Sequence, residues 1–232
     1  GGSDFYNLTT TGSSTAVTLA DAMTIANDLT IASSSSLDVS GSNYAIGIKG
    51  NWSNSATFVD QAGTVTFNGG DAQTVTSGGS DFYNLTTTGS STAVTLADAM
   101  TIANDLTIAS SSSLDVSGSN YSIGIKGNWS NSGTFVDQAG TVTFNGGDAQ
   151  SLTPGSSSFH NLTTATSSTN VTLQADITVT NDLTIASSTT LGSGSNRAIT
   201  IGGDWSNSGT FTSASGTVTF NGGDAQSLTP GS

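Results

Sequence analysis

Short stretches in which apolar residues alternate with Thr, Ser, Asp or Gly recur along the whole chain. Because successive side chains of a strand point to opposite faces, each stretch predicts a short β-strand with one buried face. Clusters of Ser, Gly, Asn and Asp separate the stretches and are typical of turns. No apolar stripe with helical spacing appears. The clearest predicted strands near the start of the chain are Val17–Leu19, Met23–Ile25, Leu29–Ile31, Leu37–Val39, Ile46–Ile48 and Val65–Phe67.

This pattern repeats with a period of 77 residues. Residues 1–77 and 78–154 differ at only five positions, and the third copy, 155–230, is one residue shorter through a deletion near Gly192. Residues 231–232 begin a fourth copy. We expect about eight to ten strands in each copy, because turn signals recur at short, regular spacing.

Two architectures are compatible with such a repeat. The first is a β-solenoid in which each copy forms three or four coils of roughly 20 to 25 residues and neighbouring coils complete the core. The second is a string of small antiparallel β-sandwiches, one per copy. No linker or change of composition marks the junctions 77/78 and 154/155, so we favour one continuous solenoid.

Positions that stay apolar in every copy are the expected core. We expect them to form inward ladders of equivalent residues: Leu19, Leu96 and Leu173; Ile31, Ile108 and Ile185; Phe67, Phe144 and Phe220.

The amino-acid composition excludes several functional classes for this chain. The net charge is −13 with only three Lys and Arg residues, so the chain lacks the basic footprint of a nucleic-acid-binding protein. The chain has no Cys, which excludes disulfides and zinc–thiolate sites. No segment reaches the roughly 18 apolar residues that a membrane helix requires.

The run from Gly50 through Asn51, Trp52 and Ser53 to Phe58, followed by Gly63–Gly69, resembles the repeats of large secreted bacterial surface proteins. These are the filamentous-haemagglutinin-like adhesins and the passenger stalks of autotransporters. The resemblance covers all three copies. It implies a right-handed parallel β-helix, secretion to the cell surface, and a role as stalk, fibre or adhesin.

Few residues suggest chemistry. Asp71, Asp148 and Asp224 lie in Asn-Gly-Gly-Asp turns and are weak candidates for calcium ligands, because calcium needs several converging oxygens and this unit occurs once per copy. No paired carboxylates or nucleophile–base sets are evident, so we predict no catalytic residues and no cofactor. The only His, His160, takes the place of Tyr6 and Tyr83, which argues against a catalytic imidazole.

Trp52, Trp129 and Trp205 recur once per copy within Trp-Ser-Asn sequences. We expect an aromatic corner that is buried against the next coil. The alternative is an exposed row on which sugars stack.

These observations predict a non-catalytic extracellular structural fibre or stalk. Neither end resembles a capping segment, so we expect either a much longer array of repeats or chains that stack head to tail on themselves. The alternatives are an adhesin that binds glycans or other surfaces and, less favoured, a carbohydrate-active β-helix enzyme.

Overall fold

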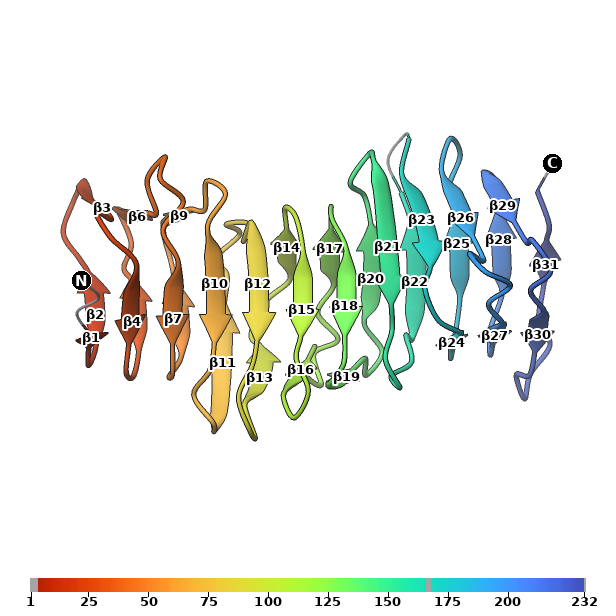
Figure 1. The fold of residues 1–232 in the computed structure, drawn as a ribbon, viewed down its shortest axis with the longest axis horizontal. Coiled ribbons are helices and arrows are strands. Elements are labelled where there is room, and N and C mark those ends of the chain that lie inside the picture. Colours follow the sequence, from red (N-terminus) through yellow and green to blue (C-terminus); the bar gives the residue numbers. More distant parts are fainter. Residues whose placement is uncertain (1–3, 166–167, 232) are drawn as a thin grey trace.

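The chain forms a rod of stacked coils (Figure 1). The computed structural model describes residues 4–165 and 168–231. Its 31 strands stack in parallel and make about eleven coils of about 21 residues, and no helix occurs in the described ranges. The predicted all-β solenoid is therefore confirmed. The alternative of small antiparallel sandwiches is wrong, because the paired strands run parallel.

Each coil contributes three strand positions, and the coils stack them into three faces. Face 1 is one uninterrupted sheet that runs the length of the rod (Figure 1). Its strands are β1 (Asp4–Phe5), β4 (Met23–Ile25), β7 (Ile46–Ile48), β10 (Thr64–Phe67), β12 (Asn84–Thr87), β15 (Leu106–Ile108), β18 (Trp129–Asn131), β21 (Ala149–Thr153), β23 (Asn170–Leu173), β26 (Thr190–Gly192) and β29 (Thr210–Thr212).

Face 2 consists of two sheets that follow one another along the rod, with Phe159 between them. The strands are β2 (Leu8–Thr10), β5 (Leu29–Ile31), β8 (Trp52–Asn54), β11 (Ala72–Thr76), β13 (Ala93–Leu96), β16 (Ser113–Asp115) and β19 (Thr134–Val136), then β24 (Ile177–Val179), β27 (Ile199–Ile201) and β30 (Val218–Phe220).

Face 3 is divided in the same way by Phe82, which forms an isolated parallel bridge to Ile102. Its strands are β3 (Thr15–Thr18), β6 (Ser35–Asp38) and β9 (Thr57–Val59), then β14 (Met100–Ile102), β17 (Ile123–Ile125), β20 (Thr141–Phe144), β22 (Asn161–Thr164), β25 (Leu183–Ile185), β28 (Trp205–Asn207) and β31 (Leu228–Thr229).

One sequence repeat does not correspond to a whole number of coils. The first repeat holds eleven strands, β1–β11, which exceeds the expected eight to ten. In each later repeat Phe82 or Phe159 takes the first position and ten strands follow. Eleven positions at three per coil make three and two-thirds coils, so equivalent residues move to another face in each repeat. Trp52 lies on face 2, Trp129 on face 1 and Trp205 on face 3.

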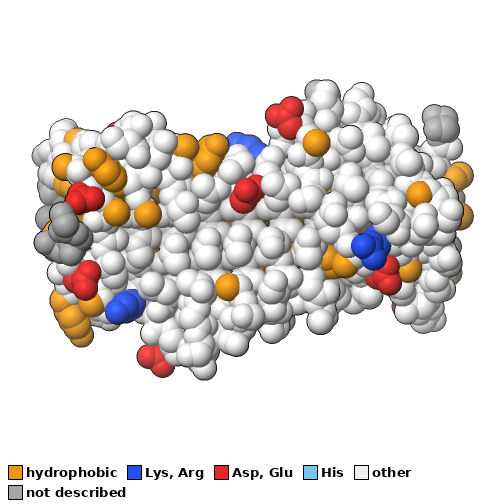
Figure 2. All heavy atoms as spheres, in the orientation of Figure 1, with side chains coloured by type: hydrophobic (Ala, Val, Ile, Leu, Met, Phe, Trp, Pro, Cys, Tyr) orange, Lys and Arg blue, Asp and Glu red, His pale blue; other side chains and the backbone are white. Residues whose placement is uncertain are grey.

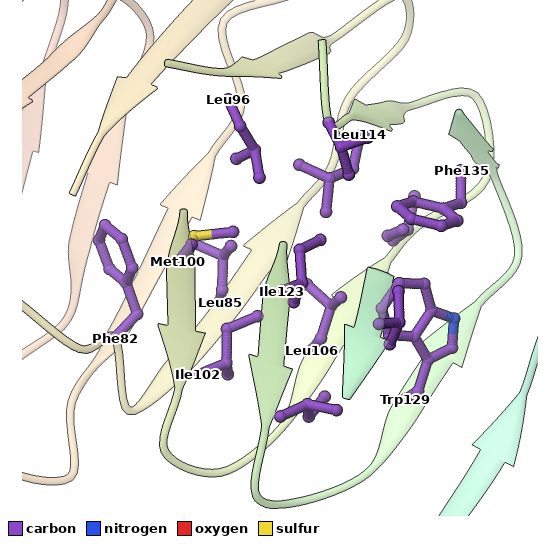
Figure 3. Packing of buried hydrophobic residues seen from close by; sticks show 14 of the residues in the cluster. Phe82, Leu85, Leu96, Met100, Ile102, Leu106, Leu114, Ile123, Trp129 and Phe135 are labelled. Carbon is purple, nitrogen blue, oxygen red and sulfur yellow. The ribbon is translucent and has the colours of Figure 1, made fainter. Parts of the chain in front are cut away.

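Figure 3 shows the interior of the middle coils, where apolar side chains from all three faces meet. Of the nine residues predicted as core, seven are buried, whereas Leu19 and Phe220, in the terminal coils, are half-buried. The predicted ladders of equivalent residues are wrong, because the face shift separates such residues. Ile31 instead stacks between Thr10 and Asn54, in parallel register.

Polar side chains hold successive coils together at the corners. The Oδ1 atom of Asp28 accepts hydrogen bonds from the backbone N–H and the side-chain amide of Asn51, one coil further on. Asp105 binds Asn128 in the same way. Gln73 reaches inward and donates to the carbonyls of Ile48 and Gly50. These bonds satisfy backbone groups where the chain leaves one sheet for the next.

Two corner glycines lead to a paired prediction. A Cβ on Gly146 would collide with the Lys126 carbonyl, and Gly stands at this position in all three repeats. A Cβ on Gly133 would also collide with backbone carbonyls, yet the first repeat carries Ala56 there. We expect Gly146→Ala to cost about 2 kcal/mol of unfolding free energy, as overpacking typically does, and Gly133→Ala to cost clearly less. Urea denaturation of both variants measures the difference, and equal losses would contradict this explanation.

Candidate functional site at the repeat joints

The three Trp residues lie inside the rod, at the points where one repeat meets the next. Their exposed fractions are 1% for Trp52, 1% for Trp129 and 4% for Trp205. Each begins a strand instead of occupying a corner, so the predicted burial agrees with the structure but the predicted corner placement is wrong. With so little exposed ring surface, none of the three can stack on a sugar.

We call each point where one repeat meets the next a joint. A complete joint contains three aromatic rings, and the third ring comes from the following repeat. At the first joint the ring of Trp52 lies 4.8 Å from Phe58 and 5.2 Å from Phe82, between ring centroids, and both pairs are edge-on. Phe82 is the fifth residue of the second repeat. Edge-on pairs at this distance add to the stabilisation that burial alone provides.

The second joint reproduces this geometry on different faces. Trp129 lies 4.8 Å from Phe135 and 5.3 Å from Phe159, again edge-on. Figure 3 shows the rings of Trp129 and Phe135 side by side in the interior. The indole N–H groups of Trp52, Trp129 and Trp205 are buried without a hydrogen-bond partner. The Trp side chains therefore act through packing and not through polar recognition.

A buried Asn adds a polar clamp to each joint. The Nδ2 of Asn54 donates to the Ser77 carbonyl at 2.7 Å and to the Ser80 hydroxyl at 3.0 Å, and its Oδ1 accepts from the Ala56 backbone N–H at 2.9 Å. In the second joint Asn131 makes the same set of bonds, to Pro154, Ser157 and Gly133. One side chain thus ties the end of a repeat to the start of the next.

The alternation of apolar and polar residues does not mark most of these residues. Asn54 occupies an inward position that apolar alternation does not mark, and Phe58 and Phe82 are not adjacent to Trp52 in the chain. The available signal was the recurrence of Phe at positions 5, 82 and 159 beside the recurrence of Trp.

The structure separates the candidate calcium ligands. Asp71, Asp148 and Asp224 are exposed, and they precede β11, β21 and β31, which lie on three different faces. The described residues contain no group of three or more His, Cys, Asp or Glu side chains that could hold a metal ion. The repeated turn therefore does not build a column of stacked acidic residues.

Charged groups are sparse, and a small set lies beside the first joint. Lys126 Nζ is 3.2 Å from Asp81 Oδ2, but both side chains are well exposed, so the pair contributes little. Partial burial raises the pKa of Asp60, and the nearby charge of Asp81 raises it further. Burial and like charge both disfavour the ionised form.

Asp60→Asn should therefore raise the melting temperature slightly at pH 7. Because the pKa of Asp60 lies above its ordinary value of 3.8 in the folded protein, the ionised carboxylate opposes folding only at higher pH. The gain should disappear below about pH 3, where folded and unfolded chains both carry a neutral carboxyl. Thermal melts of both proteins at the two pH values make the comparison, and an equal gain at low pH would point to packing instead.

Fold and joints together define a parallel β-solenoid built from tandem repeats. Comparison with protein-family models, with curated proteins and with solved structures found no match to the chain. Among the described residues there is no helix long and apolar enough to span a membrane.

Proposed function

We propose that the protein is a non-catalytic structural rod that assembles end to end into a filament on the outside of the cell. The observation that carries this proposal is face 1, whose eleven strands pair without interruption from the first described coil to the last. Continuous backbone pairing gives a rod stiffness and resistance to proteolysis. About eleven coils at roughly 4.8 Å per coil give a rod of about 53 Å.

The surface supports a structural role. Outward strand positions are mostly small, and in parallel register they form rows such as Thr66, Thr86 and Thr107 on face 1. Figure 2 shows few charged side chains, scattered over this view of the rod. Small neutral residues can stack every 4.8 Å without the repulsion that rows of like charges create. The net charge of −13 keeps neighbouring rods apart sideways.

The placement outside the cell rests on the resemblance to repeats of secreted bacterial surface proteins. The adhesin alternative loses its best candidate surface, because the Trp rings are buried. Binding of glycans or other surfaces would have to use the Thr and Ser rows.

Electron microscopy and sedimentation of the purified chain test this function. We expect rods about 53 Å long that join into longer threads of constant width as the concentration rises. Particles that stay one rod long at every concentration would contradict end-to-end assembly. Particles that associate side by side would contradict the role assigned to the net charge.

A further inference from the structure

The last aromatic joint lacks its third ring. Trp205 lies 4.8 Å from Phe211 in the same edge-on geometry as in the two complete joints. At the position where Phe82 and Phe159 complete those joints, the described chain leaves an open hollow of about 320 Å³. Its lining is apolar and consists of Trp205, Phe211, Val218, Phe220, Leu228 and Pro230. Leu228 is 58% exposed, whereas its equivalents Val75 and Leu152 are fully buried.

The first described coil presents the missing group. Phe5 is 44% exposed, although its equivalents Phe82 and Phe159 are each 1% exposed. Leu8 and Val17 are half-buried, whereas Leu85 and Val94, one repeat later, are fully buried. Hydrophobic atoms reach the surface at both ends of the rod (Figure 2). The two ends therefore expose complementary halves of a structure that occurs twice, complete, inside the rod.

The phase of the repeat brings these halves onto the same face. Each repeat shifts equivalent positions by one face, so three repeats restore the starting face. Phe211 and Phe5 both belong to face 1, as strands β29 and β1. Likewise β30 and β2 share face 2, and β31 and β3 share face 3. A second copy can stack on the last coil by translation along the rod, without a one-third turn.

We propose that the first coil of a second copy docks on the last coil, with its Phe5 filling the hollow beside Trp205 and Phe211. This inference rests on the proposed end-to-end function and specifies its contact. The internal joints supply the register. Thr141 pairs with Asn161, Val142 with Leu162 and Thr143 with Thr163. One repeat later, the same register pairs Thr217 with Asn7, Val218 with Leu8 and Thr219 with Thr9 of the second copy.

The contact is directional. Parallel pairing places the last coil of one copy against the first coil of the next, so two first coils do not match each other. A contact of this kind does not close on itself and generates an open filament. The lining of the hollow on the last coil contains no ionisable side chain.

Disulfide trapping tests the register, and the absence of Cys from the chain gives a clean background. Thr9 and Thr219 are exposed, and the proposed pairing brings their Cα atoms to about 4.8 Å, within disulfide range. We expect a Thr9→Cys protein mixed with a Thr219→Cys protein to form cross-linked dimers on mild oxidation. Thr217→Cys in place of Thr219→Cys moves the thiol two residues along the strand and should cross-link far less.

Two outcomes of the trapping experiment would overturn the proposed joint. One is equal cross-linking from Thr217→Cys and Thr219→Cys, which would show that the register is not fixed. The other is efficient dimer formation by the Thr9→Cys protein alone, which would place two first coils together.

Phe5→Ala tests whether Phe5 of a second copy fills the hollow. Because Phe5 is the anchor of the joint, we expect the end-to-end association constant, measured by sedimentation, to fall at least about 30-fold while the melting temperature of the single rod barely changes. Tyr6→His is the matched control, since the second joint already carries His160 at that position, and it should associate like the parent chain.

The possible results separate the two proposals. If the parent chain forms filaments and Phe5→Ala forms them equally well, the proposed docking of Phe5 in the hollow is wrong, whereas the filament function stands. If the parent chain does not associate at all, the end-to-end function itself is wrong and the joint fails with it.

Discussion

Trp129→Ala should be among the most damaging single substitutions in the chain. The side chain is 1% exposed and contacts Phe135 and Phe159 edge-on, so its removal empties the centre of a complete joint. Truncating a buried Trp to Ala typically costs about 3–5 kcal/mol, since lost burial and an unfilled cavity add together. Urea denaturation followed by circular dichroism measures the loss.

Trp205→Ala is the matched control for this prediction. Trp205 packs against Phe211, the equivalent of Phe135, but has no third ring within the described chain, and it lies one coil before the last. We expect a smaller loss, confined to the terminal coils, because each coil of a solenoid contacts only its neighbours. An equal loss in both variants would show that the third ring adds nothing to a joint.

Asn131→Asp should have an effect of similar size for an electrostatic reason. Asn131 is 1% exposed, and its Nδ2 donates to the Pro154 carbonyl at 2.8 Å. The substitution replaces that donor with a carboxylate oxygen that faces a carbonyl in the interior. An uncompensated buried charge of this kind costs about 3–5 kcal/mol at neutral pH.

The pH dependence distinguishes this mechanism from simple loss of packing. Burial raises the pKa of the new carboxyl, so the folded chain binds its proton more tightly than the unfolded chain does. The stability difference from the parent should therefore shrink as the pH falls, once the neutral carboxyl can donate to Pro154. Asn120→Asp is the control, because Asn120 is exposed and accepts its bond from the Ala139 N–H through an oxygen that Asp retains. A pH-independent loss in Asn131→Asp would contradict the mechanism.

The fold class and the bounds of several strands could be predicted from the sequence. Strict alternation placed Met23–Ile25, Leu29–Ile31 and Ile46–Ile48 at the bounds that the structure has for β4, β5 and β7. These strands are simple because their inward residues are aliphatic and their outward residues are Thr or Gly. Alternation missed β8, because the second inward residue of Trp52–Asn54 is the polar Asn54.

The number of strand positions in each repeat could not be predicted in the same way, and this number sets how the repeat aligns with the coils. A repeat has eleven strand positions if the position of Phe82 is counted and ten if it is not. Phe82 forms only one isolated bridge. The segment that leads to it begins with Gly78 and Gly79 and contains no alternating stretch that would predict a strand. One position more or less decides which residues stack on one another. The aromatic joints follow from that alignment, so the sequence showed the recurrence of Trp and Phe without showing that they meet.

Cryo-electron microscopy of the assembled protein tests the central claim most directly, because the rise and rotation per copy report how coils continue from one chain to the next. The joint predicts a rise of about 53 Å per copy, faces 2 and 3 that continue through every contact, an interruption of face 1 at Phe5 like those at Phe82 and Phe159, and only the slow twist of the coils between copies. A filament in which successive copies are turned by a third, meet head to head, or lie side by side would contradict the account.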